Sequence, residues 1–358
     1  MKHNKICFAI HCIGHGGAER VVSILCSRFA EKGYDVHLIC NHQREWEYPI
    51  SPLVTRHIIG EDVSCIRPVA SYQRISRMRR ICKREEFDVL IAFMSMNEYS
   101  VFATYGMRTK NVISTRLAPE VLYNTFFKRT FARLLLSTAS GAVFQTVAAQ
   151  KWFPARLQQK SIVIFNPIAS EFYDVPREPI EGRIVATGRL VRQKNYPLML
   201  EAFAFVAQSH GVKLVICGKG EELDDLKART DRLGISDIVT FCGQCDDVPS
   251  ALSKADIYLL TSDYEGLPNA LMEAMAVGVP CVATDCLGGG SRLLMGDSER
   301  GMLVPRGESR KIAEAIISLL DNPELKLKLA SSAKEFAGCF SVDSCFQEWE
   351  RYINSFID

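Results

Sequence analysis

The chain has 358 residues, of which 47% are hydrophobic and 23% are charged, and its formal net charge is +2. This composition is that of an ordinary folded protein and excludes a disordered chain, and the length predicts two domains. The small net charge gives no argument for nucleic-acid binding. Thirteen cysteines without a dense short-spaced framework favour a reducing compartment, so we expect a cytoplasmic protein.

Three local features give little support to export, membrane insertion or metal binding. The basic start is followed by a few apolar residues and then at once by glycines and histidines, which predicts a first strand and not a signal peptide. No apolar run approaches ~18 residues, so we expect no membrane-spanning helix. Cys242 and Cys245 form a single C-x-x-C, a weak zinc signal without a second pair or nearby histidines, and we favour two chance thiols.

The predicted first strand, residues 5–11, leads into a glycine turn and then a helix. The helical pattern comes from Val21, Val22, Ile24, Leu25 and Phe29. A dinucleotide-binding loop would need a third glycine where Glu19 stands, so we reject that hypothesis. Gly16 and Gly17 still allow a diphosphate or an acceptor to approach the backbone closely, and a β-α turn without a ligand remains the alternative.

Strand and helix patterns alternate through the rest of the first half, which predicts a doubly wound parallel sheet. The expected strands are residues 35–40, 55–59, 87–93 and 111–115, with a helix over 71–84. Ligands of such sheets bind beyond the carboxyl ends of the strands. The candidate loops in this half are therefore residues 11–17, 94–98 and 116–119.

Two stretches of the first half alternate basic and apolar residues. One contains Arg74, Arg77, Arg79, Arg80, Lys83 and Arg84, and the other runs from Phe126 to Leu136 with Lys128, Arg129 and Arg133. Helices of this kind bind anionic bilayer surfaces, at ~1 kcal/mol per basic residue close to the lipid. The alternative for each stretch is a solvated helix face whose other side lies in the core.

Residues 173–182 are rich in proline and charge and are the expected linker. A second set of strand and helix patterns follows it, with strands expected at residues 183–187, 212–217, 238–241, 257–260 and 280–284. The second half therefore predicts another Rossmann-like sheet.

Cationic and glycine residues follow the strands of this second sheet. Arg189 and Lys194 leave the end of its first strand, where a guanidinium and an ammonium can neutralise a diphosphate leaving group. Gly218 and Gly243 mark later strand ends where a nucleotide base could rest against backbone. Surface solvation is the alternative for the two cations.

Residues 257–274 read as a strand, a polar turn and the start of a helix. The first amides of that helix, at Asn269, Ala270 and Leu271, and the helix dipole suit a phosphate. Glu265 and Glu273 bracket the turn about 12 Å apart if the chain between them is helical. They can hold the two ends of one extended ligand such as a nucleotide-sugar, unless Glu265 is only a helix cap and Glu273 an ordinary surface residue.

Three motifs together strongly resemble glycosyltransferase family 4. They are E-G-L-P-N-A-L-M-E over Glu265 to Glu273, G-G-A-E-R over Gly16 to Arg20, and G-R-L-V-R-Q-K-N over Gly188 to Asn195. The resemblance covers nearly the whole chain. It implies an α/β fold of GT-B architecture, in which two Rossmann-like doubly wound parallel-sheet domains face each other across a cleft, and a retaining, metal-independent sugar transfer.

The resemblance also implies the domain limits and one further site residue. We expect an acceptor-side domain over residues 1–172, a nucleotide-sugar domain over 183–340, and a last helix over 341–358 that crosses back to the first domain. Family members often carry a polar group at the position of Arg116, close to the reacting sugar. Many of them have glutamate where Thr115 stands here, so a role for Thr115 is not expected.

These observations lead to one functional hypothesis. The enzyme would move a hexose or N-acetylhexosamine from a UDP-sugar to a glycan or polyprenyl-diphosphate-linked oligosaccharide in bacterial surface polysaccharide synthesis, meaning O-antigen, capsule or a glycoprotein glycan. Arg189, Lys194 and the helix amides would stabilise the departing diphosphate. Glu265 would hold the sugar and offset oxocarbenium charge, while Glu273 would hold the ribose.

The same hypothesis includes no cofactor, because the sequence has no Asp-x-Asp for a metal. Its setting would be the cytoplasm, with peripheral binding to the anionic inner-membrane surface. The two alternatives are a nucleotide-sugar epimerase on the same fold and a nucleotide-sugar-binding protein without turnover.

Overall fold

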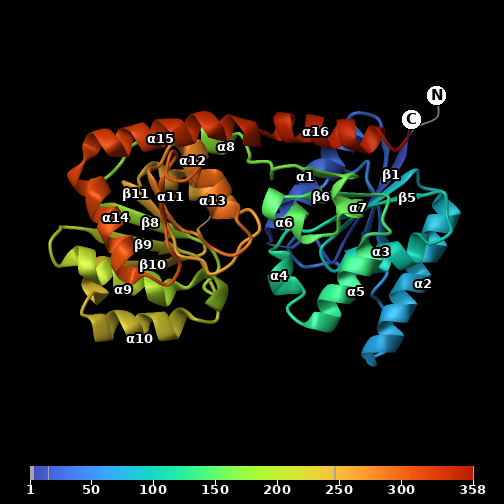
Figure 1. Ribbon diagram of the computed structural model, residues 1–358, viewed down its shortest axis with the longest axis horizontal. Helices are drawn as coiled ribbons and strands as arrows, with labels where there is room; N and C mark the ends of the chain where they lie inside the picture. Colours follow the sequence, from blue (N-terminus) through green and yellow to red (C-terminus); the bar gives the residue numbers. More distant parts are fainter. Residues whose placement is uncertain (1–3, 15, 246, 358) are drawn as a thin grey trace. The chain divides into compact units, whose positions relative to one another are not determined.

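The computed structural model describes residues 4–14, 16–245 and 247–357 and divides the chain into two units. The first unit comprises the chain up to Pro167 together with Val342–Asp358, and the second comprises Ile168–Ser341. In each unit helices cover a parallel β-sheet, as Figure 1 shows. Among the described residues, no helix is long and apolar enough to cross a bilayer.

The first unit contains a seven-stranded sheet in the order β3-β2-β1-β4-β5-β6-β7, and neighbouring strands are parallel. Its strands are β1 (Lys5–Ile10), β2 (Asp35–Cys40), β3 (Thr55–Ile58), β4 (Val89–Phe93), β5 (Lys110–Ser114), β6 (Gly141–Phe144) and β7 (Ser161–Val163). The central strands β1 and β4 are almost wholly buried, which explains why their sequences are continuous apolar runs.

The helices of the first unit are α1 (Gly17–Glu31), α2 (Arg67–Glu85), α3 (Met96–Thr104), α4 (Pro119–Leu122), α5 (Phe126–Leu136), α6 (Val147–Trp152), α7 (Ala155–Gln158) and α16 (Val342–Asn354). Helices α1 and α16 pack together against one part of the sheet, where Phe29 meets Phe346. Helices α2 and α3 contribute to a second apolar cluster, and α5, α6 and α7 to a third. The last helix thus completes the core of the first unit.

The second unit contains a six-stranded parallel sheet in the order β10-β9-β8-β11-β12-β13. Its strands are β8 (Arg183–Thr187), β9 (Lys213–Cys217), β10 (Val239–Gly243), β11 (Ile257–Leu260), β12 (Cys281–Thr284) and β13 (Met302–Val304). Chain order reverses between β8 and β11, because β9 continues on one side of β8 and β11 pairs on the other. Such a switch point is where doubly wound sheets bind ligands.

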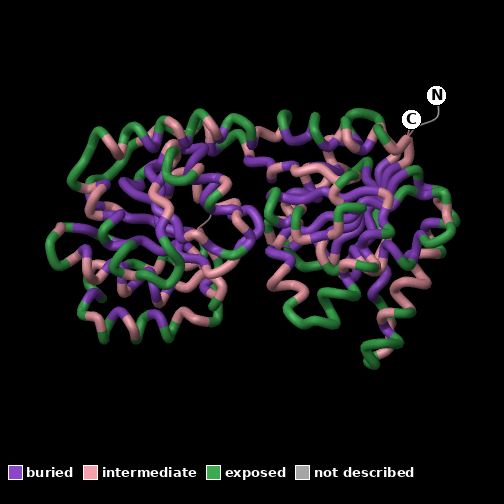
Figure 2. Tube along the Cα trace, in the orientation of Figure 1, coloured by how far each residue is buried: buried purple, intermediate pink, exposed green. Residues whose placement is uncertain are grey.

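The helices of the second unit are α8 (Glu171–Asp174), α9 (Tyr196–Ala207), α10 (Leu223–Leu233), α11 (Val248–Ser253), α12 (Asn269–Val277), α13 (Gly290–Met295), α14 (Ser309–Asp321) and α15 (Pro323–Ala337), with short 3₁₀ turns at Arg192–Lys194, Ser236–Ile238 and Gly338–Phe340. Buried residues of α9 and α14 join those of the strands in one large core. Figure 2 shows the strands of both units buried and the exposed residues on the outer helices.

The segment predicted as a linker, residues 173–182, is instead part of the second unit. The Tyr173 hydroxyl donates to the carbonyl of Ala337 at 2.9 Å. The Arg177 guanidinium donates to the carbonyls of Leu252, Ser253 and Ala255 at 2.7–3.1 Å. These contacts anchor the segment, and the boundary of the first unit therefore lies at Pro167, five residues before the predicted limit at residue 172.

Candidate active site

Two loops at the switch point of the second unit bring an ammonium and a carboxylate into contact. Lys194 lies in the loop after β8 and Glu265 in the loop after β11, and their side chains are 14% and 9% exposed. Lys194 Nζ is 2.6 Å from Glu265 Oε1, so the two form a largely buried ion pair. Ser262 Oγ donates to the same oxygen at 2.8 Å, and Gln193 Nε2 donates to Glu265 Oε2 at 3.2 Å. Both oxygens of the carboxylate are thereby fixed in position.

Further hydrogen bonds join the two loops and place the ion pair. Thr261 Oγ1 donates to the carbonyls of Lys194 and Asn195 at 3.0 and 3.1 Å. Asn195 Nδ2 donates to Asp263 Oδ1 at 3.1 Å, and its own oxygen caps helix α9 by accepting from the Leu198 amide. Asn195 has a φ of 47°, a left-handed conformation that asparagine tolerates better than most residues. The position of Lys194 therefore depends on this sharp turn.

Helix α12 begins directly after the Glu265 loop, as the sequence predicts. One of the three amides predicted to bind a phosphate, that of Leu271, already donates a hydrogen bond within the protein. The amides of Leu271 and Met272 both donate to the Pro268 carbonyl at 3.1 Å. The expectation that the Leu271 amide is open to a phosphate is therefore wrong for this conformation. The first two residues of α12, Asn269 and Ala270, are half-buried.

Glu273 lies one turn into α12 and is only 8% exposed. This burial excludes the alternative that it is an ordinary surface residue. Burial raises the pKa of Tyr258, and the negative charge of Glu273 adds a smaller effect in the same direction. The Tyr258 hydroxyl lies 3.3 Å from Thr187 Oγ1 at the end of β8. A second carboxylate therefore lies in the interior of the same unit, close enough to act electrostatically on β11.

The other predicted residues of this unit also lie at the carboxyl edge of the sheet. Arg189 lies two residues after the end of β8, is exposed, and has no hydrogen bond or ion pair from its side chain to any described residue. Gly218 follows β9, and a Cβ there would collide with the carbonyl oxygen of Gly188. Its amide donates to the carbonyl of Gly243 at 2.7 Å. Glycine is thus required where the loops after β8 and β9 approach each other.

Comparisons with known proteins agree on one family. Residues 176–336 match glycosyl transferases group 1, and residues 15–158 match Glycosyltransferase Family 4. The chain is 33% identical to the N-acetyl-alpha-D-glucosaminyl L-malate synthase of Bacillus anthracis over 89% of its own length and 88% of that protein. The chain belongs to these glycosyltransferases. The enzyme therefore catalyses glycosyl transfer.

Two further similarities extend over the whole enzyme. It is 25% identical to the N-acetylgalactosamine-N,N'-diacetylbacillosaminyl-diphospho-undecaprenol 4-alpha-N-acetylgalactosaminyltransferase of Campylobacter jejuni, over 98% of this chain and 99% of the relative. The structure of Anabaena HepE in complex with UDP and glucose superposes with a TM-score of 0.80 at 19% identity, covering 99% of this chain and 100% of HepE. The glycosyltransferase thus has the GT-B fold of two Rossmann-like units predicted from the sequence.

In the first unit of the glycosyltransferase, Gly16 and Gly17 begin helix α1 but do not leave its N-terminus open. Gly16 is the residue before the helix, and Gly17 is its first residue. The carboxylate of Glu19 lies where a Cβ of Gly16 would be. An anionic side chain at a helix start is favourable because of the helix dipole. A diphosphate at this position would have to displace the Glu19 side chain, so a role for Gly16 and Gly17 in binding one stays a prediction.

Arg116 is buried in the core of the first unit, contrary to the expectation that it faces a reacting sugar. The residue is 8% exposed, and its guanidinium carbon lies 5.0 Å from the Phe93 ring centre and 5.4 Å from that of Trp349 on α16. Its Nη1 donates to Asn166 Oδ1 at 2.8 Å. Burial lowers the pKa of Arg116 to about 9. The arginine therefore holds α16 to the sheet through cation–π contacts.

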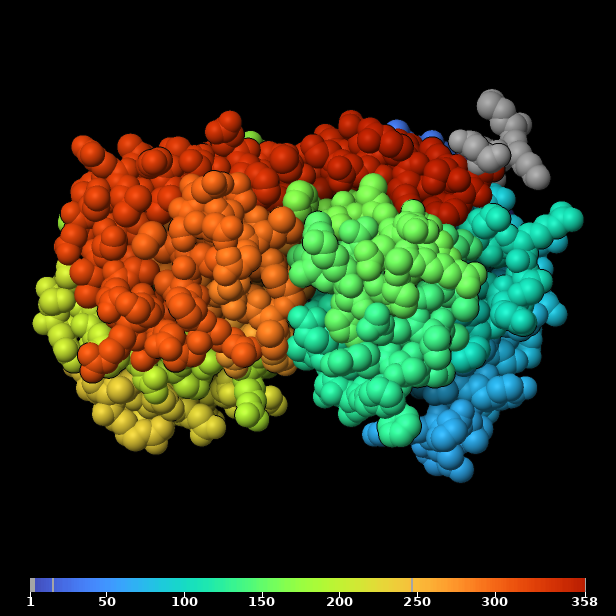
Figure 3. All heavy atoms as spheres, in the orientation of Figure 1, coloured from blue at the N-terminus to red at the C-terminus, as the bar shows by residue number. Residues whose placement is uncertain are grey.

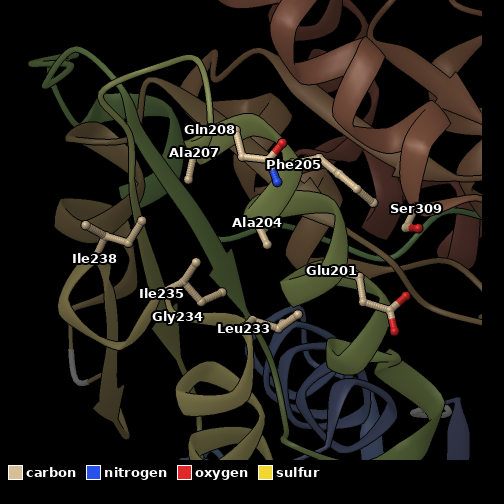
Figure 4. A pocket seen from close by; sticks show the side chains of 10 residues that line it. All are labelled: Glu201, Ala204, Phe205, Ala207, Gln208, Leu233, Gly234, Ile235, Ile238 and Ser309. Atoms are coloured by element: carbon tan, nitrogen blue, oxygen red, sulfur yellow. The ribbon is translucent and has the colours of Figure 1, made fainter.

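Figure 4 shows a pocket in the second unit that does not include any predicted site residue. It is lined by Glu201, Ala204, Phe205, Ala207, Gln208, Leu233, Gly234, Ile235, Ile238 and Ser309 and has a volume of about 380 Å³. The lining comes from α9, the end of α10 and the start of α14, and most of it is apolar. The contacts at Lys194 and Glu265, and not this pocket, identify the candidate active site.

Sequence reasoning missed three residues that hold the ion pair, namely Gln193, Ser262 and Thr261. Gln193 also donates to the carbonyl of Tyr264 at 2.8 Å, so it fixes both the backbone and the carboxylate of the Glu265 loop. Gln193 could have been predicted from its position next to Lys194 in the same strand-end loop. Ser262 and Thr261 lie between a strand end and a site glutamate, and they could have been found in the same way.

Proposed function

We propose that the enzyme is a retaining glycosyltransferase that moves a hexose or N-acetylhexosamine from UDP to a glycan or polyprenyl-diphosphate-linked oligosaccharide. The observation that carries this proposal is the contact between Lys194 and Glu265 at the β8/β11 switch point. In a UDP-sugar the bond that breaks joins the anomeric carbon to a phosphate oxygen. A cation for the leaving phosphate and an anion for the developing oxocarbenium ion are therefore needed side by side.

The other site residues of the second unit would bind the remaining parts of the donor, namely its diphosphate, ribose and base. Arg189, which is exposed and unpaired among the described side chains, would meet the diphosphate together with Lys194 and the start of α12. Glu273 would accept hydrogen bonds from the ribose, and the backbone at Gly218 and Gly243 would support the base. These groups supply the positive charge that a metal supplies in other transferases, so we propose that no metal cofactor is needed.

In this mechanism the departing phosphate accepts the proton of the acceptor hydroxyl, so no separate protein base is required. Glu265 keeps its charge through the reaction and stabilises the positive charge that grows on the sugar ring. Its three donors, Lys194, Ser262 and Gln193, hold it in place before substrate arrives. Such preorganisation is the usual source of electrostatic catalysis.

The chemical class of donor and acceptor is supported by relatives. The similar Campylobacter jejuni enzyme is named as an N-acetylgalactosaminyltransferase acting on a diphospho-undecaprenol-linked sugar, and the HepE structure contains UDP. We therefore propose that this enzyme acts in bacterial surface-glycan assembly, in O-antigen, capsule or glycoprotein glycan synthesis, on the cytoplasmic face of the inner membrane.

The test is incubation of the purified enzyme with a panel of UDP-sugars and polyprenyl-diphosphate-linked acceptors. We expect UDP release with one donor, unchanged in the presence of a chelator, and an α-configured product by NMR from an α-configured donor. A β-configured product would contradict retention, and a strict requirement for Mn²⁺ or Mg²⁺ would contradict metal independence. A new epimer of the donor, or donor binding without turnover, would replace the proposed activity with one of the two alternatives.

We also propose that the enzyme binds an anionic bilayer through α5. Four apolar side chains of this helix are unusually exposed: Phe126 (76%), Phe127 (83%), Phe131 (53%) and Leu134 (69%). Lys128 and Arg129 are exposed on the same helix, and α5 lies on the surface of the first unit in Figure 3. Exposed aromatic residues beside cations suit the interface between headgroups and acyl chains. In α2, by contrast, Arg77 and Arg79 are bound to backbone carbonyls.

Neutralising Lys128 and Arg129 together should lower binding to acidic vesicles. At about 1 kcal/mol per basic residue near the lipid, the double Gln variant should bind roughly 30-fold more weakly at low salt. Flotation or sedimentation with vesicles measures this binding. The matched control is Lys227→Gln with Arg232→Gln, an exposed basic pair on α10. Equal binding of the wild type to neutral and acidic vesicles would reject the docking surface.

A further inference from the structure

Polar residues gather at the carboxyl edge of the first sheet, in the loops that follow β1, β2 and β3. His11 directly follows β1, and Asn41 directly follows β2. The backbone amide of Asn41 donates to the His11 carbonyl at 2.9 Å, and the Gly60 amide donates to the Asn41 carbonyl at 3.0 Å. Chain order reverses at β1, which pairs with β2 on one side and with β4 on the other. Doubly wound sheets bind ligands at such a reversal.

The side chains of these loops meet in a small cluster. The Asn41 side chain is only 3% exposed, and its Nδ2 lies 2.9 Å from His11 Nδ1. The rings of His11 and His42 stand edge to face, with 5.4 Å between their centres. A Cβ at Gly60 would collide with the Asn41 carbonyl oxygen and lie 3.1 Å from the His42 ring. Glycine is therefore needed where the third loop packs against the second.

Arg44 adds a cation to this cluster. Its Cγ would lie 3.9 Å from a Cβ at Gly14, so its side chain reaches back to the loop after β1. The guanidinium makes no ion pair with a described residue. Of the two carboxylates in the same loop, Glu45 is exposed and Glu47 pairs with Arg56 at 2.5 Å. The positive charge of Arg44 is therefore unpaired in the described part of the first unit.

Arg74 adds a second cation from α2. It lies one turn before Arg77, whose Nη1 donates to the Ile59 carbonyl at 3.2 Å, directly beside Gly60. Residues three positions apart share one face of a helix, so Arg74 belongs to the face that packs on this loop. Its Nε is buried and has no hydrogen-bond partner among the described residues. A buried guanidinium nitrogen without a partner is unusual in a native protein, and a bound anion would supply one.

The surroundings of His11 keep its ring neutral in the free protein. Burial lowers the pKa of His11, and the neighbouring His42, Arg44 and Arg74 lower it further. A neutral ring accepts at Nδ1 from Asn41 Nδ2, and this contact leaves Asn41 Oδ1 buried without a partner. The described cluster therefore combines unpaired positive charge with a buried oxygen that lacks a donor.

We propose that this cluster binds the diphosphate of the acceptor and that His11 takes up a proton from solvent on binding. A protonated ring carries hydrogen on both nitrogens, so Nδ1 donates and needs an acceptor. A half-turn of the Asn41 amide supplies one, because it brings Oδ1 to His11 Nδ1 and gives the unpaired oxygen a donor. The Asn41 NH₂ group then occupies the former place of the oxygen. His11 Nε2, Asn41 Nδ2 and the two guanidinium groups are then all donors, as a diphosphate requires.

The acceptor is the source of this diphosphate because the diphosphate of the donor already has its own cations. In the proposed function the donor binds to Lys194 and Arg189 of the second unit, whereas the polyprenyl-diphosphate-linked acceptor carries a second diphosphate. The inference deepens that function and rests on it. It adds a cluster in the first unit, built from residues outside the donor site, that recognises the acceptor by its charge.

The experiment uses the full chain and a farnesyl-diphosphate-linked N-acetylhexosamine, a soluble diester whose charge is constant near neutral pH. Calorimetric titrations are run with excess UDP, which fills the donor site. We expect binding on the order of tenfold tighter at about pH 6 than at about pH 8, because proton uptake and anion binding are linked. Titrations in two buffers of different ionisation enthalpy measure the proton uptake directly. Equal affinity at both pH values without proton uptake, or no binding at all, would overturn the proposal.

Two substitutions test the cluster itself. His11→Gln keeps a polar partner for Asn41 and should abolish both the pH dependence and the proton uptake. Arg74→Gln should weaken binding on the order of tenfold at both pH values and leave the proton uptake in place. The matched control is Lys83→Gln, an exposed position on the opposite face of α2, which should bind the probe like the wild type. Wild-type behaviour of both His11→Gln and Arg74→Gln would also overturn the proposal.

UDP measurements separate this inference from the proposed function. His11→Gln and Arg74→Gln should bind free UDP like the wild type, and a loss of UDP affinity in either would assign the cluster to the donor and overturn the proposal. Probe binding with the expected pH dependence, but no sugar transfer from any UDP-sugar, would contradict the proposed function alone. Sugar transfer to the probe with unaltered probe affinity in both variants would contradict this inference alone.

Discussion

Lys194→Met should lower kcat by roughly 10²–10³ while the protein remains folded, because charge on the leaving diphosphate grows as the donor bond breaks. Methionine keeps most of the volume of the lysine side chain and removes its charge. The substitution also takes away the donor that lies 2.6 Å from Glu265 Oε1. Since the interaction is strongest in the transition state, KM should change far less than kcat. Initial rates of UDP release over a range of donor concentrations measure both.

A second buried lysine pair provides the control for this variant. Lys326 Nζ lies 2.8 Å from Asp256 Oδ1, with side chains 20% and 7% exposed, and it belongs to the same unit. Lys326→Met should therefore cost stability, as any loss of a buried pair does, without affecting kcat. Equal loss of activity in the two variants would show that the Lys194 effect is one of folding. Full activity of Lys194→Met would remove the ammonium from the mechanism.

The sequence predicts those parts of the site that lie in local motifs at strand ends. Lys194, Arg189 and Glu265 all lie in loops where the apolar strand pattern stops, and strands at residues 183–187 and 257–260 are observed with the predicted limits. The contact between Lys194 and Glu265 could not be predicted, because it joins residues 71 positions apart through the side chains of Thr261 and Asn195.

The first unit shows where motif reasoning fails for a physical reason. Arg116 follows a strand end, as a ligand-binding residue would, yet its guanidinium packs against the rings of Phe93 and Trp349. Trp349 lies on α16, more than 200 residues further along the chain, so no local pattern reveals the contact. Gly16 raises the same problem, since only the position of the Glu19 carboxylate decides whether the helix start is open.

Short strands and the linker were the weakest parts of the fold prediction. β13 has three residues, Met302–Val304, which are too few to give a periodic hydrophobic pattern. The strand is recognised only by its pairing with β12. The proline-rich segment over residues 173–182 has the composition of a linker. Whether this segment is a linker or part of the second unit depends on the hydrogen bonds that Arg177 donates to carbonyls at the end of α11. Composition does not encode these contacts.

Glu265→Gln should mainly affect catalysis, whereas Glu273→Gln should mainly affect UDP binding. Glutamine preserves the shape of the carboxylate and removes its charge. If Glu265 faces the sugar, its variant should mainly depress kcat and leave the affinity for free UDP nearly unchanged. If Glu273 holds the ribose, its variant loses a charged hydrogen bond worth about 1.5–3 kcal/mol and should bind UDP on the order of tenfold more weakly or worse.

Calorimetric titration with UDP separates the two glutamates, and Glu201→Gln serves as the control. Glu201 lies on α9 of the same unit, pairs with Arg229 and lines the pocket away from the ion pair, so its variant should bind UDP like the wild type. Glu265→Gln needs one further check, because it leaves the Lys194 ammonium without its partner in a largely buried place. UDP affinity close to that of the wild type is the check that this unpaired cation leaves the diphosphate site intact. Equal UDP affinity in wild type, Glu265→Gln and Glu273→Gln would show that the proposed orientation of the donor is wrong.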